Sequence, residues 1–190
     1  MTGRAKSRRV GSEGPRGSGS GRRHREAPAT LRRPRPGELG WVVQRHGEVY
    51  AREYGYDARF EGLVAKVVGD FVANFDPARE RCWIADRDGR PVGSVFLTRL
   101  RGRTAKLRLL LVETSERGTG LGGRLVRACT TFARARGYTR IELWTQAELV
   151  AARRLYEREG YRLVATKRHA MFGTPAVAET WAMELHDKGE

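Results

Sequence analysis

Hydrophobic residues recur every three or four positions in the segment that follows Asp57, which indicates a helix with one apolar face. Asp57 can cap this helix, and the Asp76-Pro77 pair stops it because the residue before a proline avoids helical backbone angles. Ahead of the helix, residues 40–44 are expected to form a short strand and residues 45–54 a short polar helix. The apolar face consists of Phe60, Leu63, Val64, Val67, Val68, Phe71, Val72 and Phe75.

Three strand-like runs follow, over residues 81–86, 91–99 and 104–112. Residues 86–90 carry turn-forming Asp and Gly and predict a hairpin loop between the first two runs. The third run ends in the apolar residues 109–112, a pattern typical of a central strand that is covered on both faces.

The second half of the chain alternates helices and strands. A glycine-rich segment, residues 117–123, leads into a predicted helix that ends at Gly137. Thr145 and Glu148 have the spacing of a capping box, which predicts a further helix over residues 147–159. The remaining strands are expected near residues 141–144, 161–169 and 177–185.

This order of elements predicts a mixed α/β (α+β) fold with a largely antiparallel sheet of six to seven strands and about four helices. The chain has 190 residues, which favours one domain. Its charge of +15 is uneven, because residues 1–36 hold 11 Arg or Lys against Glu13 and Glu26. This segment lacks apolar periodicity and is predicted to be a disordered basic tail ahead of a domain over residues 37–190. The tail is either simply solvated or makes weak contact with nucleic acid through phosphate charge.

Other classes of protein are disfavoured by the same residues. No apolar run reaches the roughly 20 residues of a membrane-spanning helix. Cys82 and Cys129 fall at apolar positions, so we expect buried thiols and a cytoplasmic location. The four histidines are scattered, and no metal site is expected.

The segment from Arg117 to Gly123 carries the most specific chemistry, because it joins a buried strand to a helix. The first amides of a helix lack partners within it, the helix dipole is positive there, and glycines let a ligand approach the backbone. The segment therefore predicts a binding site for a diphosphate. The bland alternative is a tight glycine-rich turn with nothing bound.

A rival interpretation is a dinucleotide site, because Gly118, Gly120 and Gly123 satisfy G-x-G-x-x-G. That site needs an acidic residue at the end of the second strand, where this chain has Thr145 and Gln146. It also needs further strand-helix units, for which too few residues remain.

Residues 117–122, RGTGLG, match the Q/R-x-x-G-x-G/A signature of the GNAT acetyltransferase superfamily. Residues 155–161, LYEREGY, resemble the second signature of that family, and the resemblance covers roughly residues 38–186. Residues 40–55 and 105–112 are also similar to acetyltransferase domains fused behind winged-helix regulators of the multiple-antibiotic-resistance type. Residues 1–36 are too short for such a winged helix, so no DNA-binding domain is expected.

The resemblance implies an acyl-CoA N-acyltransferase fold, whose sheet splays open beside the central strand. It implies acetyl-CoA as co-substrate, with no metal, and direct attack by a primary amine of a small molecule or protein in a ternary complex. Backbone groups of Leu110 and Val112 would bind the pantetheine arm. The diphosphate would be held by Arg117, Gly118, Thr119, Gly120, Leu121, Gly122 and Gly123.

The resemblance also makes Tyr156 the candidate donor of a proton to the departing thiolate; the alternative for Tyr156 is a core aromatic residue. The amine must lose a proton before it attacks. Glu113 is a candidate base, though it could instead cap a loop, and Glu53 is a second candidate. The alternative function is a non-catalytic acyl-CoA-binding regulatory module with a basic tail. The acceptor is open, and so is the oligomeric state, with a homodimer as one arrangement.

Overall fold

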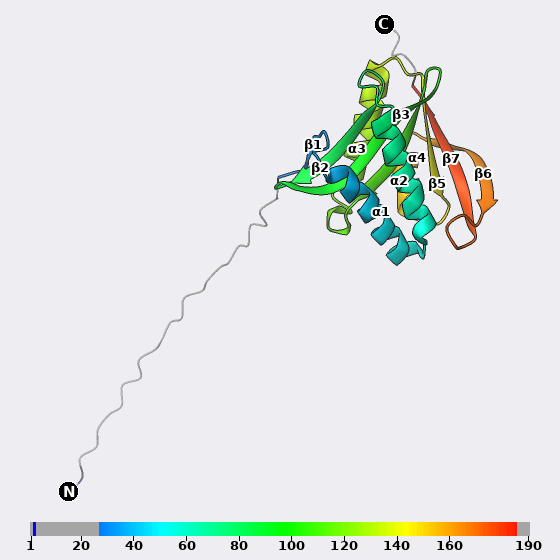
Figure 1. Cartoon of the computed structure of the whole chain (residues 1–190). Coiled ribbons are helices and arrows are strands. Elements are labelled where there is room, and N and C mark those ends of the chain that lie inside the picture. The colour runs from blue at the N-terminus through cyan, green and yellow to red at the C-terminus, as the bar shows by residue number, and fades with distance from the viewer. Residues whose placement is uncertain (1, 3–26, 186–190) are drawn as a thin grey trace.

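A seven-stranded sheet, in the order β1-β2-β3-β4-β5-β7-β6, runs through the computed structural model (Figure 1). The structure describes residue 2 and residues 27–185. All neighbouring strands are antiparallel except β4 and β5, which are parallel, so the predicted mixed, largely antiparallel fold is confirmed. The strands are β1 (Thr30–Arg32), β2 (Arg81–Arg87), β3 (Arg90–Arg101), β4 (Thr104–Val112), β5 (Arg140–Gln146), β6 (Arg162–His169) and β7 (Ala176–Glu184).

Four α-helices and one short 3-10 helix accompany the sheet in the described part of the chain. Two buried clusters lie on its opposite faces: α1 and α2 contribute to one, and α3 and α4 to the other. None of the described helices combines the length and the apolar character that crossing a membrane requires. The helices are α1 (Glu38–Tyr54), α2 (Ala58–Ala73), η1 (Thr114–Glu116), α3 (Leu121–Ala135) and α4 (Val150–Arg158).

The predicted strand over residues 40–44 is wrong, because these residues belong to α1. The run of Trp41, Val42 and Val43 favours a strand locally. However, α1 buries Val42, His46 and Val49, whose spacing of four and three residues is helical. Burial of this longer stripe therefore prevails over the local preference.

The predicted tail also differs from the structure, since its residues 30–32 form β1 and pair with β2. Arg32 holds this strand in place: it donates hydrogen bonds to Glu38 of α1 and to Asp86 of β2. Residues 1 and 3–26 of the tail lie outside the described part of the chain, so the division into tail and domain stays a prediction.

The start of α4 is a further correction. The helix begins at Val150 rather than at residue 147, and its N-cap residue, Leu149, makes no side-chain cap hydrogen bond. The predicted capping box is absent because the Glu148 carboxylate accepts a 2.7 Å hydrogen bond from the Tyr56 hydroxyl instead. The loop before α4 is thus tied to the segment between α1 and α2.

Candidate functional site

Strand β4 contains a bulge at Leu109, whose φ of 49° is left-handed. Ser94 of β3 is opposite Leu111, but Phe96 is opposite Arg108, so β4 has one extra residue there. The Ser94 hydroxyl donates a 3.0 Å hydrogen bond to the Leu109 carbonyl and supports this shape. The extra residue reverses which side chains face each side of the sheet.

The sheet opens immediately beyond the bulge. Strand β4 pairs with β5 only where residues 104–107 lie beside residues 140–143. Past this point the two strands separate, and two cavities lie along the gap between them. The larger one, the glycine pocket, has a volume of about 580 Å³ and is lined by residues 117–118 and 120–123 among others.

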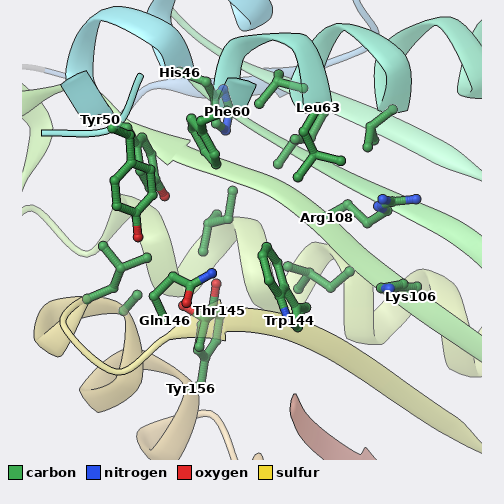
Figure 2. A pocket seen from close by; sticks show the side chains of 18 residues that line it. His46, Tyr50, Phe60, Leu63, Lys106, Arg108, Trp144, Thr145, Gln146 and Tyr156 are labelled. Atoms are coloured by element: carbon green, nitrogen blue, oxygen red, sulfur yellow. The ribbon is translucent and has the colours of Figure 1, made fainter. Parts of the chain in front are cut away.

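The smaller cavity, the aromatic pocket, has a volume of about 140 Å³ and lies between the sheet and helices α1 and α2 (Figure 2). Its aromatic lining residues are His46, Tyr50, Tyr56, Phe60, Trp144 and Tyr156. The two cavities share four lining residues, so they adjoin at the opening of the sheet. The shared residues are Tyr50, Leu110, Leu149 and Ala152.

The glycine pocket has the features that a diphosphate requires. Gly120 caps α3 with a φ of 85°, and Gly118 has a φ of 79°. A Cβ atom added to either glycine would meet no atom within 4 Å, so open space lies in front of both. The first turn of α3 contains no acidic residue of its own, and the Glu159 carboxylate that lies beside Gly123 accepts a 2.6 Å hydrogen bond from Arg127. These residues fit the diphosphate of acyl-CoA.

Eight of the nine residues predicted to bind the cofactor line this pocket. Thr119 does not, because its hydroxyl donates a 2.7 Å hydrogen bond to the Glu116 carbonyl. Arg117 lines the pocket and donates a 2.9 Å hydrogen bond to Glu53 of α1, which raises the pKa of the Arg117 guanidinium. The eight lining residues are Leu110, Val112, Arg117, Gly118, Gly120, Leu121, Gly122 and Gly123.

Tyr156 is 5% exposed and lines the aromatic pocket. In Figure 2, Tyr156 enters from the α4 side and Tyr50 enters from the opposite side. Burial raises the pKa of the Tyr156 phenol well above its ordinary value, and the nearby Tyr50 and Cys129 add to the effect. Tyr156 therefore keeps its proton at neutral pH and can donate a hydrogen bond into the cavity.

The structure does not bring Glu113 together with Tyr156. The Glu113 carboxylate accepts two hydrogen bonds, of 2.6 and 2.8 Å, from the Arg45 guanidinium of α1. Glu113 lines neither of the two cavities, and no carboxylate lines the aromatic pocket. In the described residues, no three His, Cys, Asp or Glu side chains gather as metal ligands do.

Two cations of the aromatic pocket, Lys106 and Arg108, were not predicted from the sequence. They lie two residues apart on β4 and so share one face of the strand. Burial lowers the pKa of both groups. The alternation of charged and apolar residues over 104–108 was the available signal. It did not reveal the pocket, because a solvated strand edge gives the same pattern.

The two buried thiols were predicted correctly. Cys82 and Cys129 are both buried and unbonded, and burial raises the pKa of each thiol. They face opposite sides of the sheet, because they belong to different core clusters.

Known proteins resemble this chain in sequence and in fold. A mycothiol acetyltransferase from Beutenbergia cavernae is 36% identical over 103 residues, covering 53% of this chain and 33% of that protein. The human N-acetylaspartate synthetase is 34% identical over 88 residues, covering 46% and 29%. The matches thus span about a third of the length of these curated relatives.

Solved structures agree over most of the chain. An acetyltransferase from Streptococcus agalactiae superposes with a TM-score of 0.69 at 21% identity, covering 83% of this chain and 99% of that one. A Salmonella typhimurium protein solved with its cofactor acetyl-CoA gives 0.68 at 14% identity, covering 86% and 98%. These likenesses show the fold, and residues 52–161 match the family described as Acetyltransferase (GNAT) family. The chain therefore belongs to the GNAT acetyltransferase family.

Proposed function

We propose that this protein transfers the acetyl group of acetyl-CoA to a primary amine. The observation that carries this proposal is the meeting of two cavities at the opening between β4 and β5. The glycine pocket fits a diphosphate carrier, and the aromatic pocket is a separate space for a second substrate. Tyr156 lies on the side of the second space, next to the shared residues Leu149 and Ala152.

The carrier would be held mainly by backbone groups. Amides from Gly118 to Gly123 would donate to the diphosphate, with Arg117 adding charge. Because β4 and β5 separate past Leu107, the backbone of Leu110 and Val112 is not paired to β5 and would serve the pantetheine arm. When bound, acetyl-CoA supplies an acyl carbon that is activated as a thioester.

Amine activation follows from the charges around the aromatic pocket. A free alkyl amine has a pKa of about 10.4 and is mostly protonated at neutral pH. Lys106 and Arg108 line the pocket and no carboxylate does, so the local positive charge lowers the pKa of a bound amine. The amine then loses its proton to water, and a dedicated carboxylate base such as Glu113 is not required.

Tyr156 would act on the leaving group, the sulfur of CoA. The amine nitrogen forms the new C–N bond while the C–S bond breaks, and the sulfur departs as a thiolate that takes a proton. The phenol of Tyr156 stays protonated because it is buried, so it can supply that proton and recover it from water.

Release of free CoA with a panel of amines tests the proposal, and acetyl-CoA binding is measured separately by calorimetry. We expect wild type to bind acetyl-CoA and to release CoA in the presence of an amine. Gly120→Glu should abolish both, because bulk and negative charge would fill the open space before α3. If the protein bound acetyl-CoA but released no CoA with any amine, the non-catalytic acyl-CoA-binding module would be favoured over the enzyme.

The relatives do not identify the acceptor, since they are named for different products, mycothiol and N-acetylaspartate. Direct attack in a ternary complex, a cytoplasmic location, a homodimer and the likeness to domains behind winged-helix regulators also stay predictions. Contact of the basic tail with nucleic acid stays a prediction, and residues 1 and 3–26 of that tail lie outside the described part of the chain.

A further inference from the structure

The charged groups of the aromatic pocket are of one sign. Lys106 and Arg108 form no ion pair or side-chain hydrogen bond with any residue that the structure describes, and both are partly buried. The two carboxylates whose charges act on these cations, Glu142 on Lys106 and Asp70 on Arg108, are already paired with other cations. Asp70 accepts a 2.8 Å hydrogen bond from Lys66, and Glu142 accepts bonds of 3.1 and 3.0 Å from Arg101 and Arg140.

Two partly desolvated cations without a counterion are costly, and an anion placed between them would offset that cost. No described carboxylate of the protein supplies it, because none lines this cavity. An acidic group of a ligand in this cavity would supply that negative charge.

Gln146 adds a neutral donor to the same cavity. Its side chain belongs to a residue that is 2% exposed, and its amide nitrogen, Nε2, is buried with no hydrogen-bond partner. Figure 2 shows this nitrogen on the cavity side of Gln146. A buried donor without a partner is rare in folded proteins and points to a group that the ligand would bring.

The orientation of this amide is fixed by its neighbours. The Met171 backbone N–H donates a 3.1 Å hydrogen bond to Nδ1 of His169, so Nδ1 is an acceptor. The proton of the neutral imidazole is then on Nε2, which lies 2.9 Å from Gln146 Oε1 and donates to it. The reversed amide would leave His169 with no ring proton, so Nε2 of Gln146 must face the cavity.

Building on the proposed function, we propose that the acceptor is a small amine that carries an acidic group, a carboxylate or a phosphate. Lys106 and Arg108 receive the acidic group, and Gln146 donates to an oxygen of the same molecule. The cavity volume of about 140 Å³ suits a small molecule. The attraction between the acidic group and these two cations draws the substrate into the pocket.

Matched pairs of amines test this inference by CoA release. The pairs are β-alanine with β-alaninamide, γ-aminobutyrate with its amide, and O-phosphoethanolamine with ethanolamine. We expect kcat/KM to be at least roughly tenfold higher for the acidic member of the pairs that fit, since a hydrogen bond to a charged group contributes about 1.5–3 kcal/mol. The phosphate pair distinguishes the two kinds of acid.

Arg108→Gln and Lys106→Gln should each remove most of that preference, so that the acidic and neutral members of a pair react with similar kcat/KM. Arg162→Gln is the matched control, because Arg162 is exposed on β6 and lines neither cavity. Circular dichroism on every variant checks that it is folded, and calorimetry checks that it still binds acetyl-CoA.

A binding readout separates this inference from the proposed function. With CoA-saturated protein, the acidic amines should raise Tm and their neutral partners should not, whether or not turnover occurs. Failure to bind acetyl-CoA would overturn the proposed function. Acetyl-CoA binding with no preference for acidic amines, in Tm or in turnover, would overturn only the inference drawn here.

Discussion

Arg117 and Glu53 are joined by a 2.9 Å hydrogen bond between charged groups, which ties the glycine segment to α1. The Arg117 side chain is 45% exposed, so the pair itself adds at most about 1 kcal/mol to stability. The larger effect is on position, because α1 holds this guanidinium at the edge of the glycine pocket.

The two partners of this pair can be tested separately. Arg117→Gln should weaken acetyl-CoA binding roughly tenfold, since it removes a charged donor to phosphate. Glu53→Gln breaks the same ion pair but keeps the cation, and acetyl-CoA affinity should hold or rise. Calorimetry at two salt concentrations measures both. Equal weakening in the two variants would mean that the ion pair, and not the Arg117 charge, supports binding.

Substitution of Gly120 has two effects that can be measured separately, strain of the backbone and obstruction of the ligand. Gly120→Ala should cost about 1 kcal/mol in the free energy of unfolding, because φ is 85° and an alanine resists that angle. It should also reduce acetyl-CoA affinity at least roughly tenfold, since the new methyl group enters the space before α3. Gly137→Ala is the control: its φ is 71° with nothing within 4 Å, and it lines neither pocket. Denaturant titration should give a similar loss for both variants, and calorimetry should show weakened binding only for Gly120→Ala.

Tyr156→Phe removes one hydroxyl from the aromatic pocket. We expect kcat to fall by about 10²-fold or more, the range of general acid catalysis, with acetyl-CoA affinity and Tm nearly unchanged. Tyr161→Phe is the control, because Tyr161 is buried beside Tyr156, with ring centroids 5.9 Å apart, but lines neither cavity. An unchanged kcat in Tyr156→Phe would assign that residue to the core alone.

His169 is expected to act through Gln146. Replacing His169 with Phe removes the donor to Gln146 Oε1, so the amide can rotate and its Nε2 loses a fixed direction. KM for the acidic amine should rise a few-fold while kcat and acetyl-CoA affinity stay the same. Gln146→Leu should raise KM at least as much, and the double variant should add nothing further. Additive effects would contradict the positioning role of His169.

Stability should fall in acid because of His46. Burial lowers the pKa of His46 from 6.5 to about 4, so the unfolded chain binds the proton more tightly than the folded one. Its contribution to the free energy of unfolding is present above pH 6.5 and is lost as the pH falls toward 4, by about 3 kcal/mol. Urea titrations of wild type and His46→Gln from pH 7.5 to 4 measure this. The variant should lose less stability over that window, and parallel curves would contradict the assignment.

The local sequence was sufficient to predict the elements that bury a strong periodic apolar pattern or that end near a glycine. The strand over residues 104–112 was predicted with the bounds it has, and the helix after the glycine segment ends at Ala135, two residues before Gly137. The glycine pocket follows from the same local facts. A strand, glycines with open space before them and the first amides of α3 are consecutive in the chain.

Contacts between distant residues decided the rest. The Leu109 bulge depends on pairing with β3, and it is this bulge and the separation from β5 that open the sheet. Glu113 precedes a helical turn in sequence, but only the fold brings Arg45 to it from 68 residues away. The acid-binding character of the aromatic pocket likewise needs β4, β5 and α2 together. A sequence shows which residues are charged, whereas the tertiary structure determines which of those charges are partly buried and left without a partner, and so which of them are suited to a ligand of opposite charge.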